Sequence, residues 1–243
     1  MTISTSFDAL SPKVLRTWAK QQRTPTVMAS FPHNTLCQYI TRLPFFQKAQ
    51  SVLAFYPMPD ELSLEGAWQE RPQGQRWFFP KLVEKADVLS SPAMAFLEKP
   101  SQDPSFQVVQ QLTVHPQFTT LQEPIETLER VAFEPLLQEE RFLPTCLVCV
   151  PGLIFGVLPE ATSQPSQYVR MGRGRGYYDR YLAWLQQRYR QCRERLLLVG
   201  VSPQVTVPEA HTTHYISLLA QQQPWDIPLE ALVTERGYHG RTT

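Results

Sequence analysis

The sequence predicts an α/β fold in which a mostly parallel central sheet is flanked by helices in three layers. Two observations carry this prediction. Short apolar runs recur along the chain, and several are continuously apolar rather than alternating, as expected of strands covered by helices on both faces. Other segments carry apolar residues at helical spacing. Because no Gly/Ser-rich linker or block of charge divides the chain, we expect one domain over residues 1–243.

The individual elements can be placed along the chain. Ser11 followed by Pro12 is typical of a helix N-terminus and predicts a helix that runs to about Gln22. A second helix is predicted over Tyr178 to Arg195, which has an apolar stripe and a basic opposite face. The apolar runs predict strands at Ser51 to Tyr56, Trp77 to Pro80, Ala93 to Leu97, Cys146 to Val150, Leu196 to Val201 and Tyr215 to Leu219.

Composition narrows the class of protein. A hydrophobic content of 42% in 243 residues is enough to bury a sizeable core without metals or disulfides. The formal net charge of +1 argues against a general attraction to nucleic acid or anionic lipid. No apolar run approaches the ~20 residues that span a bilayer, and the N-terminus, with Asp8, has no signal-peptide pattern. We therefore expect a cytoplasmic monomer that binds neither nucleic acid nor membranes.

Two pairs of residues match metal-site spacings only superficially. Cys146 and Cys149 form a C-x-x-C pattern inside an apolar run. Residues three apart on a strand point to opposite faces, so these two thiols are not expected to share a metal. His211 and His214 follow Pro208 in a loop-like region, and no zinc site is predicted there.

The segment RMGRGRGYYDR, residues 170–180, precedes the second predicted helix and carries three glycines and four arginines. Glycines let backbone N–H groups approach an anion, and a helix N-terminus adds further donors. Arginines near a helix N-terminus cost ~0.3–1 kcal/mol each, so the cluster predicts a bound anion, with triphosphate as the obvious candidate. The pattern is neither a Walker A loop nor G-x-G-x-x-G. A solvated basic turn or an RNA-contacting loop are the alternatives.

GRGRGYYDRYL, preceded by VPGLIF, resembles the signature of the 5-formyltetrahydrofolate cyclo-ligases, also called 5,10-methenyltetrahydrofolate synthetases. In that family a strand ends in V-P-G-x-x-F, and a loop R-L-G-x-G-x-G-Y-Y-D-R leads into a helix. The resemblance extends over most of the chain. Supporting segments occur in the expected order at Lys13 to Arg16, Tyr56 to Glu61, Phe79 to Lys81, Glu123-Pro124, Gln204 and Pro208 to His211.

The resemblance implies that the formyl oxygen of 5-formyltetrahydrofolate is phosphorylated by ATP, after which N10 attacks the activated carbon and phosphate leaves. It implies Arg175 and Tyr178 as catalytic residues and Asp179 as a ligand of Mg²⁺, which prefers one or two carboxylates plus phosphate oxygens. Folate would be bound by Tyr56, Glu61 and Tyr178, with Glu61 accepting hydrogen bonds from the pterin. ATP would be bound by Lys13, Arg16, Arg170, Gly172, Arg173, Gly174, Arg175, Gly176 and Tyr177.

Some positions depart from the family pattern. Thr212 stands where an Asp usually follows the P-E-x-H element, which removes a possible metal ligand. Lys13 lies three residues before Arg16 rather than four, which rotates the lysine by ~100° around its helix. Gly156 replaces an Asp after V-P-G-x-x-F. The segment Leu158 to Gln167, before Arg170, is longer than usual in the family. Both this segment and the tail after Ala220 are predicted to be surface loops.

These departures keep a second function open, a catalytically silent protein that binds folate or nucleotide in regulation. Single residues also have structural alternatives. Glu61 could be a solvated residue after a strand, and Lys13 with Arg16 an ordinary exposed helix face. One of Tyr177 and Tyr178 could fix the helix in the core, and Asp179 could complement the helix dipole.

Overall fold

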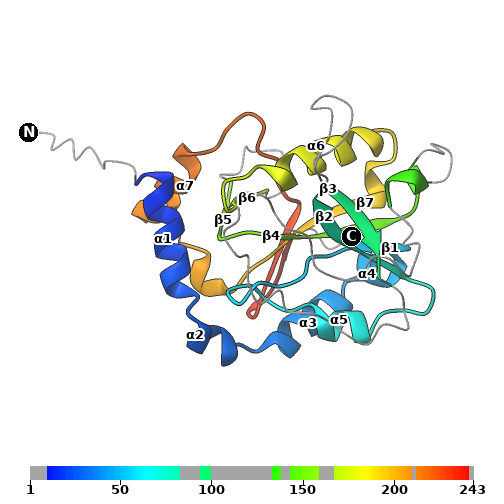
Figure 1. Ribbon diagram of the computed structural model, residues 1–243, viewed down its shortest axis with the longest axis horizontal. Helices are drawn as coiled ribbons and strands as arrows, with labels where there is room; N and C mark the ends of the chain where they lie inside the picture. Colours follow the sequence, from blue (N-terminus) through cyan, green and yellow to red (C-terminus); the bar gives the residue numbers. More distant parts are fainter. Residues whose placement is uncertain are drawn as a thin grey trace, which may run out of the picture.

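The computed structural model describes residues 10–82, 94–99, 133–137, 143–158, 167–209 and 212–240. Its helices are α1 (Pro12–Gln22), α2 (Pro25–Ala29), α3 (His33–Thr41), α4 (Pro44–Lys48), α5 (Glu65–Gln69), α6 (Tyr177–Arg188) and α7 (Thr213–Ala220) (Figure 1). Its strands are β1 (Ser51–Leu53), β2 (Arg76–Leu82), β3 (Met94–Glu98), β4 (Cys146–Pro151), β5 (Ile154–Val157), β6 (Tyr168–Met171), β7 (Leu196–Val201), β8 (Ala231–Thr234) and β9 (Gly237–Gly240). Three 3-10 turns are η2 (Glu134–Leu137), η4 (Arg193–Arg195) and η5 (Gln204–Thr206).

A seven-stranded sheet has the order β3-β2-β1-β4-β7-β8-β9. Its five inner strands, from β2 to β8, run parallel, whereas β3 and β9 pair antiparallel at the two edges. The strands β5 and β6 form a separate antiparallel hairpin. The predicted α/β class with a mostly parallel central sheet is confirmed.

Helices cover both faces of this sheet (Figure 1). One hydrophobic cluster lies under α3 and α5, and a second lies under α6. The strand β4 contributes to both, because alternate side chains point to opposite faces. Cys149 packs into the first cluster and Cys146 into the second, so the two thiols face apart as the sequence predicts.

The helices α1 and α7 pack at one end of the sheet, against the β5–β6 hairpin (Figure 1). Leu15 and Ala19 of α1 are fully buried there, together with Ile154, Val169 and Leu218. The start of α1 follows from its sequence, since the Ser11 hydroxyl accepts a hydrogen bond from the Val14 N–H at 3.4 Å and Pro12 occupies the first turn. This packing fixes α1 beside the loop that follows β6.

Several predicted elements need correction. The run Tyr215 to Leu219 is helical, not a strand, because Thr212 caps α7 and short apolar runs do not distinguish the two. The helix predicted to reach Arg195 ends at Arg188. The tail after Ala220 is not all loop, since it contributes β8 and β9. Most of the predicted loop Leu158 to Gln167, the Glu123-Pro124 pair, and His211 lie outside the described residues.

Within the part of the chain that the structure describes, no helix combines the length and apolar character needed to cross a bilayer.

Candidate active site

The predicted site residues gather at the carboxyl edge of the parallel strands. The segment after β1 carries Tyr56, Asp60 and Glu61. The turn after β4 leads into the β5–β6 hairpin, and the loop after β6 is the glycine-rich segment, residues 172–176. Parallel strands end at one edge of a sheet, which is where ligands bind in open α/β folds. The β5–β6 hairpin follows β4 at this edge, and the contact of Arg173 with Asp60 joins the loop after β6 to the segment after β1.

The glycine-rich loop, residues 172–176, has the backbone that its glycines predict. Gly174 has φ +93° and Gly176 has φ +65°, values that L side chains rarely adopt. Arg16 of α1 lies against this loop, and its Nε–H donates to the Gly172 carbonyl at 3.0 Å. A Cβ added at Gly174 would lie 3.1 Å from the Arg16 guanidinium. Glycine at this position thus lets Arg16 approach the loop.

Arg173 connects the loop to the turn after β1. Its Nη2 donates to Asp60 Oδ1 at 2.5 Å and to Glu61 Oε1 at 3.3 Å. The other Glu61 oxygen accepts from the Met58 N–H at 3.2 Å, which holds the carboxylate in place. Burial raises the pKa of Glu61, and the charge of Arg173 opposes this. The structure thus pairs a residue predicted to bind ATP with one predicted to bind folate.

Arg170, Tyr178 and Asp179 form a second group at the start of α6. Arg170 is buried, and its Nη2 donates to Asp179 Oδ1 at 2.8 Å. The Arg170 guanidinium lies over the Tyr178 ring, 5.5 Å from its centroid. The Tyr178 hydroxyl and Arg170 Nε are buried and have no hydrogen-bond partner among the described residues. Burial, with the nearby charge of Glu61, raises the pKa of Tyr178, so its hydroxyl stays protonated.

The remaining loop residues are more open. Arg175 is exposed, and Tyr177 is half-buried at the first position of α6. Arg180, one turn later, stacks its guanidinium on the Tyr177 ring at 5.3 Å. Tyr177 and Tyr178 both pack against the core cluster under α6, which agrees with a structural role for at least one of them.

Asp60 and Glu61 form the acidic turn after β1, and Tyr56 precedes this turn. Its ring is buried and stacks on Phe79 of β2, with centroids 4.2 Å apart and planes tilted by 20°. This stacking places an aromatic wall at the end of β1 and β2. Such a wall could contact a planar ring bound beside Glu61.

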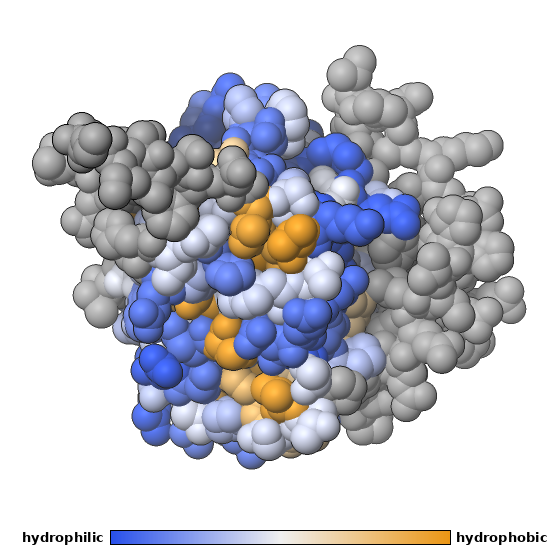
Figure 2. Space-filling model, turned by 90° about the vertical axis from the view of Figure 1, so that its left-hand side faces the viewer, coloured by the Kyte–Doolittle hydropathy of each residue, from blue (hydrophilic) through white to orange (hydrophobic). Residues whose placement is uncertain are grey.

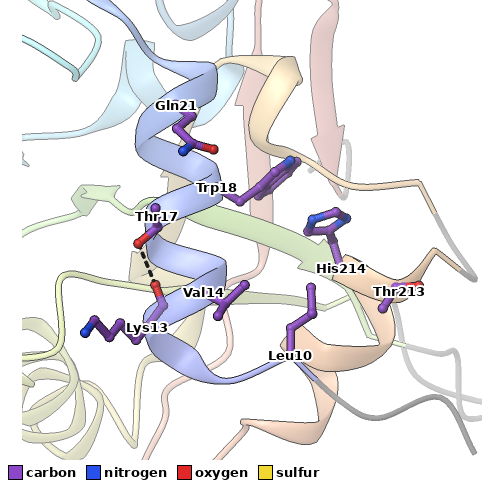
Figure 3. Close-up of a pocket in the computed structure, with 8 residues that line it drawn as sticks. All are labelled: Leu10, Lys13, Val14, Thr17, Trp18, Gln21, Thr213 and His214. Carbon is purple, nitrogen blue, oxygen red and sulfur yellow. Dashed lines mark hydrogen bonds between the residues drawn. The ribbon is translucent and has the colours of Figure 1, made fainter.

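Lys13 is the other predicted ATP-binding residue of α1 and lies one turn before Arg16. It is exposed and lines a groove of about 770 Å³ between α1 and α7, together with Leu10, Val14, Thr17, Trp18, Gln21, Thr213 and His214. In Figure 3, Lys13 and Trp18 extend from opposite sides of α1. The Trp18 ring stacks on the His214 ring, with centroids 4.3 Å apart. The outward face of this end of the molecule carries apolar patches (Figure 2). Val14 of α1 and Ile216 of α7 are exposed.

Sequence reasoning missed two residues of this region. Asp60 makes the shortest contact with Arg173, and its position directly before Glu61 was the available signal. Arg23, at the C-cap of α1, is 2% exposed and donates to the Leu153 carbonyl, Ser202 Oγ and Thr206 Oγ1. Its partners are distant in sequence, so no local pattern indicated its burial.

The fold resembles two solved structures over nearly the whole chain. The NMR structure of 5,10-methenyltetrahydrofolate synthetase from Aquifex aeolicus gives a TM-score of 0.54 at 22% identity, covering 96% of this chain and 96% of that one. The chain has the fold of a methenyltetrahydrofolate synthetase. The enzyme of that name from Mycoplasma pneumoniae gives 0.53 at 15% identity, covering 92% of this chain and 98% of that one. No protein-family model matches the chain, and no curated protein matches its sequence.

Two departures from the synthetase pattern have local explanations. Thr212 Oγ1 accepts from the Tyr215 N–H at 3.2 Å and so caps α7, a role that Thr and Asp can both fill. Gly156 lies in β5 under α7, where an added Cβ would lie 2.9 Å from the Leu218 side chain. Glycine therefore allows α7 to pack close to β5.

The charges of the site suit an anionic ligand. Five arginines lie in or beside the site, against three carboxylates. The arginines are Arg16, Arg23, Arg170, Arg173 and Arg175, and the carboxylates are those of Asp60, Glu61 and Asp179. A positive excess beside a glycine-rich loop and a helix N-terminus favours phosphate groups. Asp179 is the predicted metal ligand. Its Oδ1 accepts a hydrogen bond from Arg170, and no described residue donates to its other carboxylate oxygen. The described residues contain no cluster of three metal-binding side chains, so a Mg²⁺ here would depend on phosphate oxygens for most of its ligands.

Proposed function

We propose that this protein uses ATP to cyclise 5-formyltetrahydrofolate to 5,10-methenyltetrahydrofolate, with release of ADP and phosphate. One observation carries the proposal, the contact of Arg173 with Asp60 and Glu61. This contact joins the glycine-rich loop, which would bind the nucleotide, to the acidic turn, which would bind the folate. The proposed reaction requires the two ligands to lie side by side. The likeness of the fold to two 5,10-methenyltetrahydrofolate synthetases supports it.

In the proposed reaction the formyl oxygen attacks the γ-phosphorus and ADP leaves. N10 then attacks the formyl carbon, loses its proton, and expels the formyl oxygen as part of phosphate. Phosphoryl transfer depends mainly on positioning and on neutralising phosphate charge. The loop N–H groups, with Arg170, Arg173 and Arg175, would hold the phosphates, and Arg16 would close over the loop from α1. Glu61 would accept hydrogen bonds from the pterin, and Tyr56 and Tyr178 would flank its ring.

A Mg²⁺ ion bound with ATP would neutralise phosphate charge, and the free oxygen of Asp179 could hold it. Arg170 fixes that carboxylate through Oδ1, so Asp179 is oriented before any ligand arrives. Because this is a single carboxylate, we expect the affinity for Mg²⁺ to depend on nucleotide.

A second candidate function is a catalytically silent protein that binds folate or nucleotide. The position of Lys13 favours it, because this lysine lines the α1–α7 groove and no hydrogen bond or ion pair joins its side chain to a described residue of the glycine-rich loop. An enzyme that relied on Lys13 to neutralise phosphate would be impaired.

The test is a spectrophotometric assay of the purified protein with 5-formyltetrahydrofolate, Mg²⁺ and ATP, which follows the near-ultraviolet absorbance of the methenyl product. Growth of that absorbance only when ATP is present is the result expected of the enzyme. Calorimetric binding of folate and nucleotide without product would favour the silent protein. Binding of neither ligand would contradict both.

A further inference from the structure

Arg23 is a buried cation whose hydrogen bonds tie three parts of the site together. The residue ends α1, and its side chain reaches the turn after β4 and the η5 turn after β7. Its Nη2 donates to the Leu153 carbonyl at 2.8 Å, to Ser202 Oγ at 3.0 Å and to Thr206 Oγ1 at 2.6 Å. All three acceptors are neutral. A buried charge is costly unless other charges compensate it.

The hydrogen bonds of Arg23 also determine where α1 lies relative to the glycine-rich loop. Leu153, which accepts from Arg23, donates its own N–H to the Met171 carbonyl at 2.8 Å, directly before Gly172. Arg16, two turns earlier in α1, donates to Gly172 itself. The helix is thus attached through Arg16 to the loop after the hairpin and through Arg23, at its C-terminal end, to the residue before the hairpin. Loss of the Arg23 attachment would free one end and let Arg16 move from the loop.

The compensating charge for Arg23 comes from the acidic turn. Burial lowers the pKa of Arg23 to about 10, and the attraction of Glu61 and Asp60 opposes that decrease, so the guanidinium stays charged at neutral pH. Arg173 repels it weakly. The charged groups that act on Glu61 itself are Arg173, which favours its ionised form, and Asp60, which opposes it.

We propose that Arg23 is a positioning residue of the active site, which holds α1, and with it Arg16, against the β5–β6 hairpin and the glycine-rich loop. The inference deepens the proposed function, because Arg16 is assigned there to nucleotide. It is nevertheless testable on the protein without ligands, and its failure is therefore separate from failure of the proposed activity.

The test compares Arg23→Met and Arg23→Lys with Arg71→Met, a control that removes an arginine stacked on Trp68 at 4.4 Å. The Arg16 Nε–H, labelled with nitrogen-15, reports by NMR on its hydrogen bond to the Gly172 carbonyl. We expect this proton to exchange faster with water in Arg23→Met and Arg23→Lys than in the wild type and in the control. Unchanged exchange in both Arg23 variants, when they are folded, would overturn the proposal.

Hydrogen exchange of the Leu153 amide, which donates to the Met171 carbonyl, tests the attachment of α1 to the hairpin. We expect this amide to exchange about tenfold faster in Arg23→Lys, which lacks the planar fork. If Arg23→Met does not fold, Thr206→Val takes its place, since it removes the hydroxyl that accepts from Nε and Nη2 but keeps the charge. Faster exchange in Thr206→Val supports the proposal. Unchanged exchange in both Arg23→Lys and Thr206→Val would contradict it.

Discussion

Glu61 is a side chain whose role can be isolated. One carboxylate oxygen is held by the Met58 N–H and the other faces Arg173. The residue combines burial with a fixed orientation, as a group that recognises the hydrogen-bond donors of a pterin would. The sequence indicated Glu61 and Arg173 separately through motifs, whereas their pairing across 112 positions is a property of the fold.

Glu61→Gln should weaken binding of 5-formyltetrahydrofolate by roughly 10- to 100-fold, because hydrogen bonds to a charged group contribute about 1.5–3 kcal/mol. Affinity for a non-hydrolysable ATP analogue should stay nearly unchanged. Calorimetry with each ligand measures both effects, and Glu65→Gln in the first turn of α5 is the matched control. An unchanged folate affinity would remove Glu61 from the substrate site.

The glycine-rich loop and the helix that follows it act together as an element. Its composition predicted an anion-binding loop, and its left-handed glycines and the start of α6 agree with that prediction. Arg16 lies against this loop because α1 packs on the β5–β6 hairpin. No local sequence pattern indicates this packing. The run in α7 was predicted as a strand because short apolar runs fit a helix and a strand equally well. The strands β8 and β9 were missed because the tail after Ala220 was assigned as a loop from its polar composition.

Gly174→Ala tests the loop as an element. The substitution strains a backbone at φ +93° and brings a Cβ within 3.1 Å of the Arg16 guanidinium, so it should destabilise the protein by about 1–2 kcal/mol and weaken ATP binding. Gly74→Ala is a matched control, since Gly74 has φ +81° with no atom within 4 Å of an added Cβ. We expect a similar loss of stability in urea but full ATP affinity for the control. Equal ATP affinity in both variants would argue against a close role for the loop.

The η2 turn buries a carboxylate that the proposed reaction does not use. Glu134 Oε1 accepts from the Phe96 N–H and the Tyr181 hydroxyl, both at 2.9 Å, and burial raises the Glu134 pKa. The folded state therefore binds this proton more tightly than the unfolded state. The resulting stability is fully present below the unfolded pKa and is lost as pH rises through the folded pKa.

Glu134→Gln should remove this pH dependence. The free energy of unfolding of the wild type, relative to the variant, should fall as the pH rises above 4.5, the ordinary pKa of a glutamate, and urea titrations at several pH values measure it. The exposed Glu194→Gln variant controls for the loss of one negative charge. A constant difference between the wild type and Glu134→Gln would mean that the carboxyl is solvated in the folded protein.

At the scale of the whole molecule, the segments after β1 and β4 come together because parallel strands end at one edge of the sheet. The β5–β6 hairpin follows β4 at this edge, and α1 packs on the hairpin, which adds the glycine-rich loop and Arg16 to the site. The sequence was sufficient to predict the α/β class, most inner strands and the first helix, since these depend on local apolar patterns. It was insufficient for Arg23, because the burial of that residue follows from tertiary packing.

The most direct test of the account is the fate of the formyl oxygen. A single turnover of 5-formyltetrahydrofolate labelled with oxygen-18 in the formyl group, with ATP and Mg²⁺, would be analysed by mass spectrometry of the phosphate released. If ATP phosphorylates that oxygen before N10 closes the ring, the label will be found in phosphate. Methenyl product accompanied by unlabelled phosphate, or ATP binding without product, would contradict the proposed reaction.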